Sequence, residues 1–177
     1  MKKTNKGKVI VVMVLCMLVM GVSVGCQNDK IEYIPTVPME DQSGSDQVAN
    51  PWLEQETLED AKKATGFAIE VPDPLSGYSD MSIQTLEKEM IQVIYQGKTE
   101  ENCVTIRKGT GYEDISGDYN EYSQENQKKI GDFQVTEKGN GGKIMLAIWT
   151  SGAYAYSVDC NLGMSEKEIE TIIRFVK

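Results

Sequence analysis

The chain has 177 residues, a formal net charge of −9 and no histidine. The absence of histidine excludes Ser-His and Cys-His nucleophile pairs and histidine-ligated zinc. The acidic balance, with only two arginines, argues against a nucleic-acid partner, because phosphate binding needs clustered lysines and arginines.

Residues 1–25 have the layout of a secretion signal. Four lysines precede an almost wholly apolar run over residues 9–24, which is short for a membrane span and ends in small residues before Cys26. This junction resembles the lipobox of bacterial lipoproteins, in which signal peptidase cuts before a cysteine that carries the lipid. We expect residues 1–25 to be a lipoprotein signal peptide and Cys26 to be lipidated, for example with palmitate. The alternatives are an uncleaved N-terminal anchor and an ordinary secretory signal.

Cleavage would remove four lysines and no acid, which takes the net charge from −9 to −13. Such an acidic protein is repelled by anionic headgroups, so the lipid has to hold it at the membrane. Residues 26–50 contain Pro35, Pro38 and a polar run, a composition that favours a flexible tether. We therefore expect a cell-membrane protein, lipid-anchored on the extracytoplasmic face.

The folded domain is expected over residues 51–177, where the first element is a helix. Thr57 is placed to cap it, Asp60 follows three residues later, and Gly66 suits the left-handed position after the last turn. Leu58, Ala61 and Ala64 would form its apolar face.

Alternating or apolar segments then predict strands at residues 67–71, 81–86, 90–95, 104–106, 133–137, 144–150 and 153–160. The glycine-rich residues 139–142 indicate a hairpin turn. Ser165 and Glu168 form a capping box that starts a last helix, with an apolar stripe through Ile169, Ile172, Ile173 and Val176. The expected class is α+β, an antiparallel sheet of about six strands with an N-terminal and a C-terminal helix packed on it.

Several stretches of the domain together resemble a family of bacterial domains of unknown function. That family occurs in small lipoproteins of Gram-positive bacteria and in extracytoplasmic parts of sigma-factor regulators. The matching stretches are residues 50–52, 57–61, 64–67, 71–73, 115–120, 147–149, 154–157 and the helix that starts at Ser165. The resemblance implies one α+β domain over residues 50–177, supplies no catalytic residues, and suggests an architecture related to lipoprotein-carrier-like domains that bind rather than catalyse.

A cysteine pair and an acid-rich segment are two candidate sites. Outside the cytoplasm Cys103 and Cys160 could form a disulfide, although strand alternation places them on different faces and free thiols remain the alternative. In the acid-rich segment 113–121, Asp114, Asp118, Asn120 and Glu121 carry oxygens that suit calcium, but the spacing does not fit an EF-hand, and a solvated loop is the simpler interpretation. We expect no resident metal.

Trp149, Tyr154 and Tyr156 flank a turn between two strands. Trp149 and Tyr154 could be neighbours across the hairpin and form a binding surface. The alternative is that the three rings cover the sheet beneath the last helix.

The sequence predicts a non-catalytic domain that binds an envelope protein, peptide or lipid, without a cofactor. A sensory or regulatory domain that responds to envelope state is the alternative. A carboxylate-based hydrolase is a third hypothesis, since two acids suffice for that chemistry, but no pair of acids stands out in the sequence.

Overall fold

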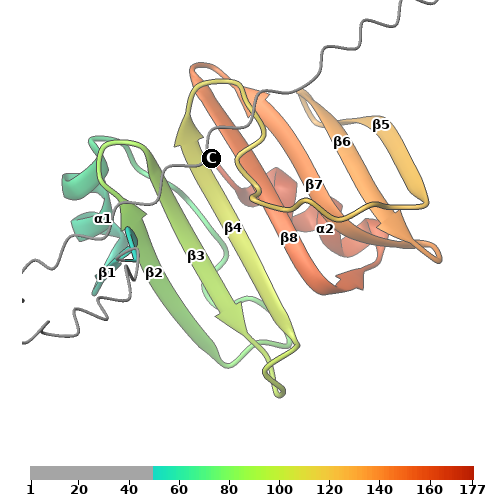
Figure 1. The fold of residues 1–177 in the computed structure, drawn as a ribbon, viewed down its shortest axis with the longest axis horizontal. Coiled ribbons are helices and arrows are strands. Elements are labelled where there is room, and N and C mark those ends of the chain that lie inside the picture. Colours follow the sequence, from blue (N-terminus) through green and yellow to red (C-terminus); the bar gives the residue numbers. More distant parts are fainter. Residues whose placement is uncertain (1–49) are drawn as a thin grey trace, which may run out of the picture. The chain divides into compact units, whose positions relative to one another are not determined.

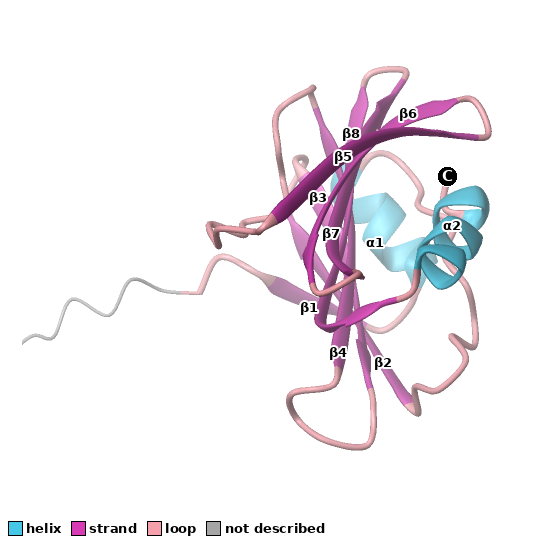
Figure 2. Ribbon diagram, turned by 90° about the vertical axis from the view of Figure 1, so that its right-hand side faces the viewer, coloured by secondary structure: helices cyan, strands magenta, loops and turns pink. Residues whose placement is uncertain are grey.

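In the computed structural model, which describes residues 50–177, an antiparallel sheet of eight strands carries two helices on one of its faces (Figure 1, Figure 2). The strands follow the spatial order β1-β2-β3-β4-β8-β7-β6-β5. Their bounds are β1 Leu53–Gln55, β2 Asp80–Leu86, β3 Met90–Gln96, β4 Cys103–Thr110, β5 Gln124–Ile130, β6 Phe133–Asn140, β7 Lys143–Ser151 and β8 Tyr154–Met164. The antiparallel sheet with two helices confirms the expected class in outline, but the expected number of about six strands is wrong.

The first helix, α1, spans Leu58–Thr65 and has the predicted caps. The Asp60 backbone N–H donates to the Thr57 hydroxyl at 3.1 Å, and Gly66, at φ 88°, donates its N–H to the Lys62 carbonyl at 2.8 Å. The helix contacts β1, β2 and β3. It follows β1 in the chain, so the expectation that a helix opens the domain is wrong.

The second helix, α2, spans Glu166–Phe175 and begins with the predicted capping box between Ser165 and Glu168. Ile169, Ile172 and Ile173 are buried against the sheet half that contains β5, β7 and β8. Each fully buried isoleucine contributes about 2 kcal/mol by leaving water, so this stripe fixes the helix in place.

Successive side chains of each strand point alternately to the face that carries the helices, here called the helix-side face, and to the opposite face, here called the outer face. Val104, Ile106 and Val158 belong to the helix-side face and are fully buried. Thr105, Arg107 and Asp159 occupy the intervening positions, so they belong to the outer face. The core therefore lies between the sheet and the helices, and polar residues of β4 and β8 gather on the outer face.

One predicted strand is absent and two strands were not predicted. Residues 67–71 are not a strand of the sheet, although Phe67, Ile69 and Val71 are buried as their alternation suggested. The segment lies beside the C-terminus instead, where Glu70 and Lys177 exchange backbone hydrogen bonds of 3.0 and 3.3 Å. Strands β1 and β5 were missed, because one is three residues long and the other is polar at almost every position.

The expected signal peptide at residues 1–25, the lipidated Cys26 and the tether as far as residue 49 lie outside the described residues. Within residues 50–177, neither helix has the length and apolar character needed to cross a membrane.

Candidate functional site

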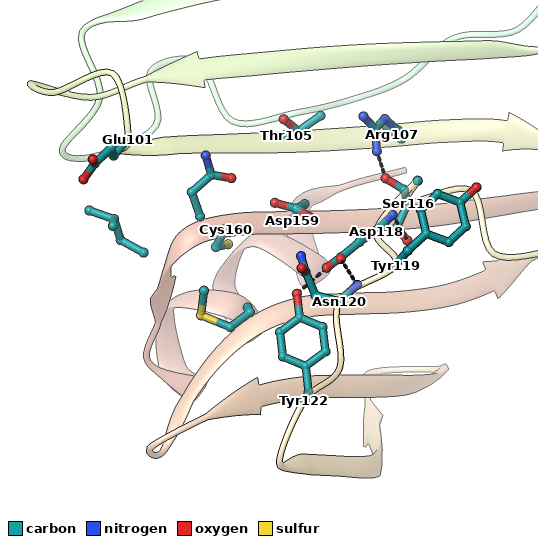
Figure 3. A pocket seen from close by; sticks show the side chains of 14 residues that line it. Glu101, Thr105, Arg107, Ser116, Asp118, Tyr119, Asn120, Tyr122, Asp159 and Cys160 are labelled. Atoms are coloured by element: carbon teal, nitrogen blue, oxygen red, sulfur yellow. Dashed lines mark hydrogen bonds between the residues drawn. The ribbon is translucent and has the colours of Figure 1, made fainter.

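Residues 111–123, here called the strap, connect β4 to β5 across the outer face (Figure 1). Between the strap and the sheet lies a cavity of about 800 Å³, here called the outer groove. Its walls come from the strap, from the outer positions of β4 and β8, and from the turn that contains Glu101 (Figure 3). The groove is thus formed by segments that are far apart in the sequence.

Asp159 and Arg107 are the charged groups on the sheet floor of the groove. Asp159 pairs with Thr105 in the β4–β8 register, one diagonal step from Arg107. Burial raises the pKa of the Asp159 carboxyl, the Asp118 charge raises it further, and Arg107 partly offsets both. Burial likewise lowers the pKa of Arg107, while Asp159 and Asp114 oppose that change. The floor therefore holds charges that are poorly hydrated.

The strap places a second carboxylate over this floor. Asp118 accepts a hydrogen bond from the Asn120 backbone N–H at 2.8 Å and another from the Tyr122 hydroxyl (Figure 3). Burial and the bond to Asp118 raise the pKa of Tyr122, which stays a donor at neutral pH. These bonds hold Asp118 in position within the strap.

A row of hydrogen-bonded side chains, here called the polar ladder, crosses the outer face to the groove. Glu54 of β1 accepts from Gln84 of β2, and Gln84 accepts from Gln92 of β3. Gln92 in turn accepts from Arg107 Nε at 2.9 Å, and Arg107 Nη1 donates to the Ser116 carbonyl of the strap. The ladder joins the first strand of the sheet to the wall of the groove.

The acid-rich segment contributes to the groove without forming a metal cluster. Asp118 and Asn120 line the groove, whereas Asp114 accepts a hydrogen bond from the Ser116 backbone N–H at 2.9 Å. Across residues 50–177 no group of three or more cysteine, aspartate or glutamate side chains is placed to hold a metal ion. The arrangement is that of a loop that uses its acids to fix its own turns.

Cys103 and Cys160 are both free thiols. Cys160 pairs with Val104 and shares its buried helix-side face, while Cys103 precedes Val104 and belongs to the outer face. The two thiols are therefore on opposite faces of the sheet, because successive side chains of a strand point to opposite faces. This is the free-thiol alternative. Burial also raises the pKa of Cys160, which makes it a poor nucleophile.

The predicted binding surface at Trp149, Tyr154 and Tyr156 lies in the core. Trp149 stacks on Tyr156 with ring centroids 5.2 Å apart, and both are buried. Tyr154 packs on Phe67 at 5.0 Å. The cross-strand neighbour of Trp149 is Tyr156 and not Tyr154, because the turn at residues 152–153 pairs Ser151 with Tyr154. The buried positions of Trp149 and Tyr156 agree with the alternative that the rings cover the sheet.

The sequence reasoning missed the groove residues Arg107, Asp159 and Tyr122, and also Gln92, which accepts a hydrogen bond from Arg107. Alternation along β4 and β8 was enough to place Arg107 and Asp159 opposite the apolar positions. It did not show that β4 and β8 are neighbours, so it could not predict that the two charges lie close together.

A scan against protein-family models, a search of the curated proteins and a search of the solved structures each found no match for this chain.

Proposed function

We propose that this chain is a lipid-anchored extracytoplasmic protein whose domain binds a polar molecule of the cell envelope in the outer groove. The observation that carries the proposal is the groove itself, a cavity of about 800 Å³ in which charged and hydrogen-bonding side chains converge. A volume of this size accommodates a small ligand or a short peptide segment. The basic, apolar and Gly-Cys pattern that ends at Cys26 supports the anchor.

Binding is proposed in preference to catalysis because of the groove's chemistry. The chain has no histidine to act as a base near neutral pH. Asp118 is engaged by Tyr122 and Asn120, which suits a positioning role better than proton transfer.

The polar ladder favours a sensory role as the second candidate. It connects the groove wall at Ser116 to Glu54 in β1, the strand that lies closest in sequence to the proposed tether. A ligand that moves the strap would disturb Arg107 and, through the two glutamines, the edge strand. In that case ligand binding would be read out where the tether enters the fold.

Native mass spectrometry of the full-length protein released from membranes in mild detergent tests the binding function. We expect a co-purified small molecule on the wild type and its loss in Thr105→Trp, which fills the groove floor with a residue that strands accept. The control is Thr150→Trp, because Thr150 is an exposed residue of β7 and does not line the outer groove. Equal ligand occupancy in Thr105→Trp and the wild type would contradict the proposal.

Metabolic labelling with palmitate tests the anchor separately. The wild type should incorporate label and Cys26→Ala should not, because the variant lacks the thiol that would carry the lipid. Equal labelling of both proteins would contradict lipidation at Cys26.

A further inference from the structure

The outer groove contains a carboxylate that the described part of the chain leaves without a direct partner. The Asp159 carboxylate is half-buried on the groove floor, and no hydrogen bond or ion pair reaches its oxygens from residues 50–177. Its surroundings disfavour the charge, since burial and Asp118 both raise the pKa of Asp159. A bound cation would restore the interaction that water supplies elsewhere on the surface.

Arg107 acts on Asp159 only through its nearby charge, since no ion pair joins the two side chains and two of the Arg107 N–H groups bind other residues. Its Nε donates to Gln92 at 2.9 Å and its Nη1 donates to the Ser116 carbonyl. The polar ladder thus fixes the guanidinium toward the strap (Figure 3). Three carboxylates, Glu101, Asp118 and Asp159, line the groove against this single guanidinium, so the lining carries an excess of negative charge.

At its other end the groove has apolar side chains beside the Glu101 carboxylate (Figure 3). Met145 and Leu162 line it, and Leu162 is 49% exposed. This wall exists because β8 departs from regular pairing with β7 between Asp159 and Met164, where Gly163 adopts a φ of 67°. Tyr119 and Tyr122 of the strap add aromatic faces, which attract organic cations.

We propose that the outer groove binds an alkylammonium group, with the ammonium beside Asp159 and Asp118 and the alkyl chain along Met145 and Leu162. This inference rests on the binding function proposed above and names its ligand class. Two sources offer this chemistry, a lysine-type side chain within a peptide and a free aliphatic diamine. The acids, the aromatic faces and the apolar end suit both.

Isothermal titration calorimetry on the full-length protein in non-ionic detergent tests the inference with three compounds. These are 1,5-diaminopentane, Nα-acetyl-lysine methylamide and glutarate, whose chain is of similar length but whose charge is opposite. We expect the two amines to bind, glutarate not to bind, and the affinity to fall as salt is added. Tighter binding of 1,5-diaminopentane indicates a free diamine as the natural ligand, and tighter binding of the lysine derivative indicates a peptide.

Asp159→Asn keeps the shape of the side chain and removes its charge, so we expect amine affinity to fall at least about tenfold. Asp132→Asn is the matched control, because Asp132 is exposed in the turn between β5 and β6 and should leave affinity unchanged. Unchanged affinity in Asp159→Asn, absence of amine binding, or tighter binding of glutarate would overturn the inference. If the amines do not bind while a co-purified molecule is still lost in Thr105→Trp, the ligand class is wrong and the binding function stands.

Discussion

The two faces of the sheet differ in whether a partly or fully buried charge has a partner within the protein. On the helix-side face, Lys108 is only 8% exposed, yet its ammonium donates to the Ala68 carbonyl at 2.6 Å and lies 4.6 Å from the centre of the Tyr154 ring. The rings of Phe67 and Tyr156 complete its surroundings. On the outer face, Asp159 has no such partner among the described residues.

The difference separates a charge that supports folding from a charge that is available to a ligand. Lys108 ties residues 67–71, which belong to no strand, to the middle of the sheet. A buried charge of this kind is tolerated because a carbonyl and aromatic faces replace water. Asp159 lacks that compensation, and the space beside it is an open groove. If the outer groove binds the proposed ligand, the charge that supports the fold and the charge that meets the ligand lie on opposite faces of the same strands.

Lys108→Ala is expected to have the largest effect on stability. It removes packed methylenes and leaves the Ala68 carbonyl without its donor, so the free energy of unfolding should fall by about 2–4 kcal/mol. Urea unfolding followed by tryptophan fluorescence measures it. Lys98→Ala, in an exposed turn, is the control and should change little. If the two variants were equally stable, Lys108 would not hold residues 67–71 in the way described.

Gln92→Leu is expected to have an intermediate effect, on the outer face. Gln92 is buried and bridges Gln84 and Arg107, so an apolar replacement leaves the Gln84 Oε1 and the Arg107 Nε without a partner and costs about 1–3 kcal/mol. The strap should also become easier to cut by chymotrypsin, since Arg107 loses the contact that orients it toward Ser116. Gln134→Leu, at an exposed position of β6, should leave both measurements near wild type. A strap equally resistant in both variants would show that the polar ladder does not hold it.

Asp159→Asn is expected to have the smallest effect, of opposite sign. Because the folded-state pKa of Asp159 is raised, its ionisation destabilises the empty protein as pH rises through the unfolded value of about 3.9 and then the folded value. The variant should be more stable than wild type at about pH 7, by at most about 1 kcal/mol, and the difference should shrink as the pH falls. Urea unfolding at several pH values measures the trend.

Asp60→Asn provides the contrast for that measurement. Lys63 and Thr57 lower the pKa of Asp60, so its charge stabilises the fold at neutral pH and this contribution is lost as pH falls. The two variants should therefore shift stability in opposite directions. A loss of stability in Asp159→Asn at neutral pH would mean that its charge is satisfied within the protein.

Short-range signals predicted much of the fold. Thr57 and Gly66 marked the ends of α1, and Ser165 with Glu168 marked the start of α2, because a cap and the groups it satisfies lie within a few residues. Strand β5 escaped detection, since an edge strand that buries little carries no alternating apolar pattern. Residues 67–71 alternate as a strand does, but their backbone bonds Lys177 rather than a strand, and Phe67, Ile69 and Val71 belong to the core cluster.

The candidate site depended on pairings that the sequence does not show. The acid-rich segment pointed to Asp118 and Asn120, and both line the groove. It did not indicate the charged residues Arg107 and Asp159 on the opposite, sheet side of the groove. Arg107 and Asp159 lie one diagonal step apart because β8 pairs with β4, and Gln92 reaches Arg107 because β3 lies on the other side of β4. Similarly, the register of the last hairpin, set by its turn, placed Tyr156 rather than Tyr154 opposite Trp149.

The sequence by itself determined the acidic charge, the absence of histidine chemistry, the helix ends and most of the strands, since these follow from composition and from neighbours along the chain. Only the tertiary structure decided which charges meet. Strand order and the path of residues 111–123 left Lys108 enclosed on one face and Asp159 open to a groove on the other. The physical reason is that a side chain's partners across a sheet are set by long-range packing, which no local pattern encodes.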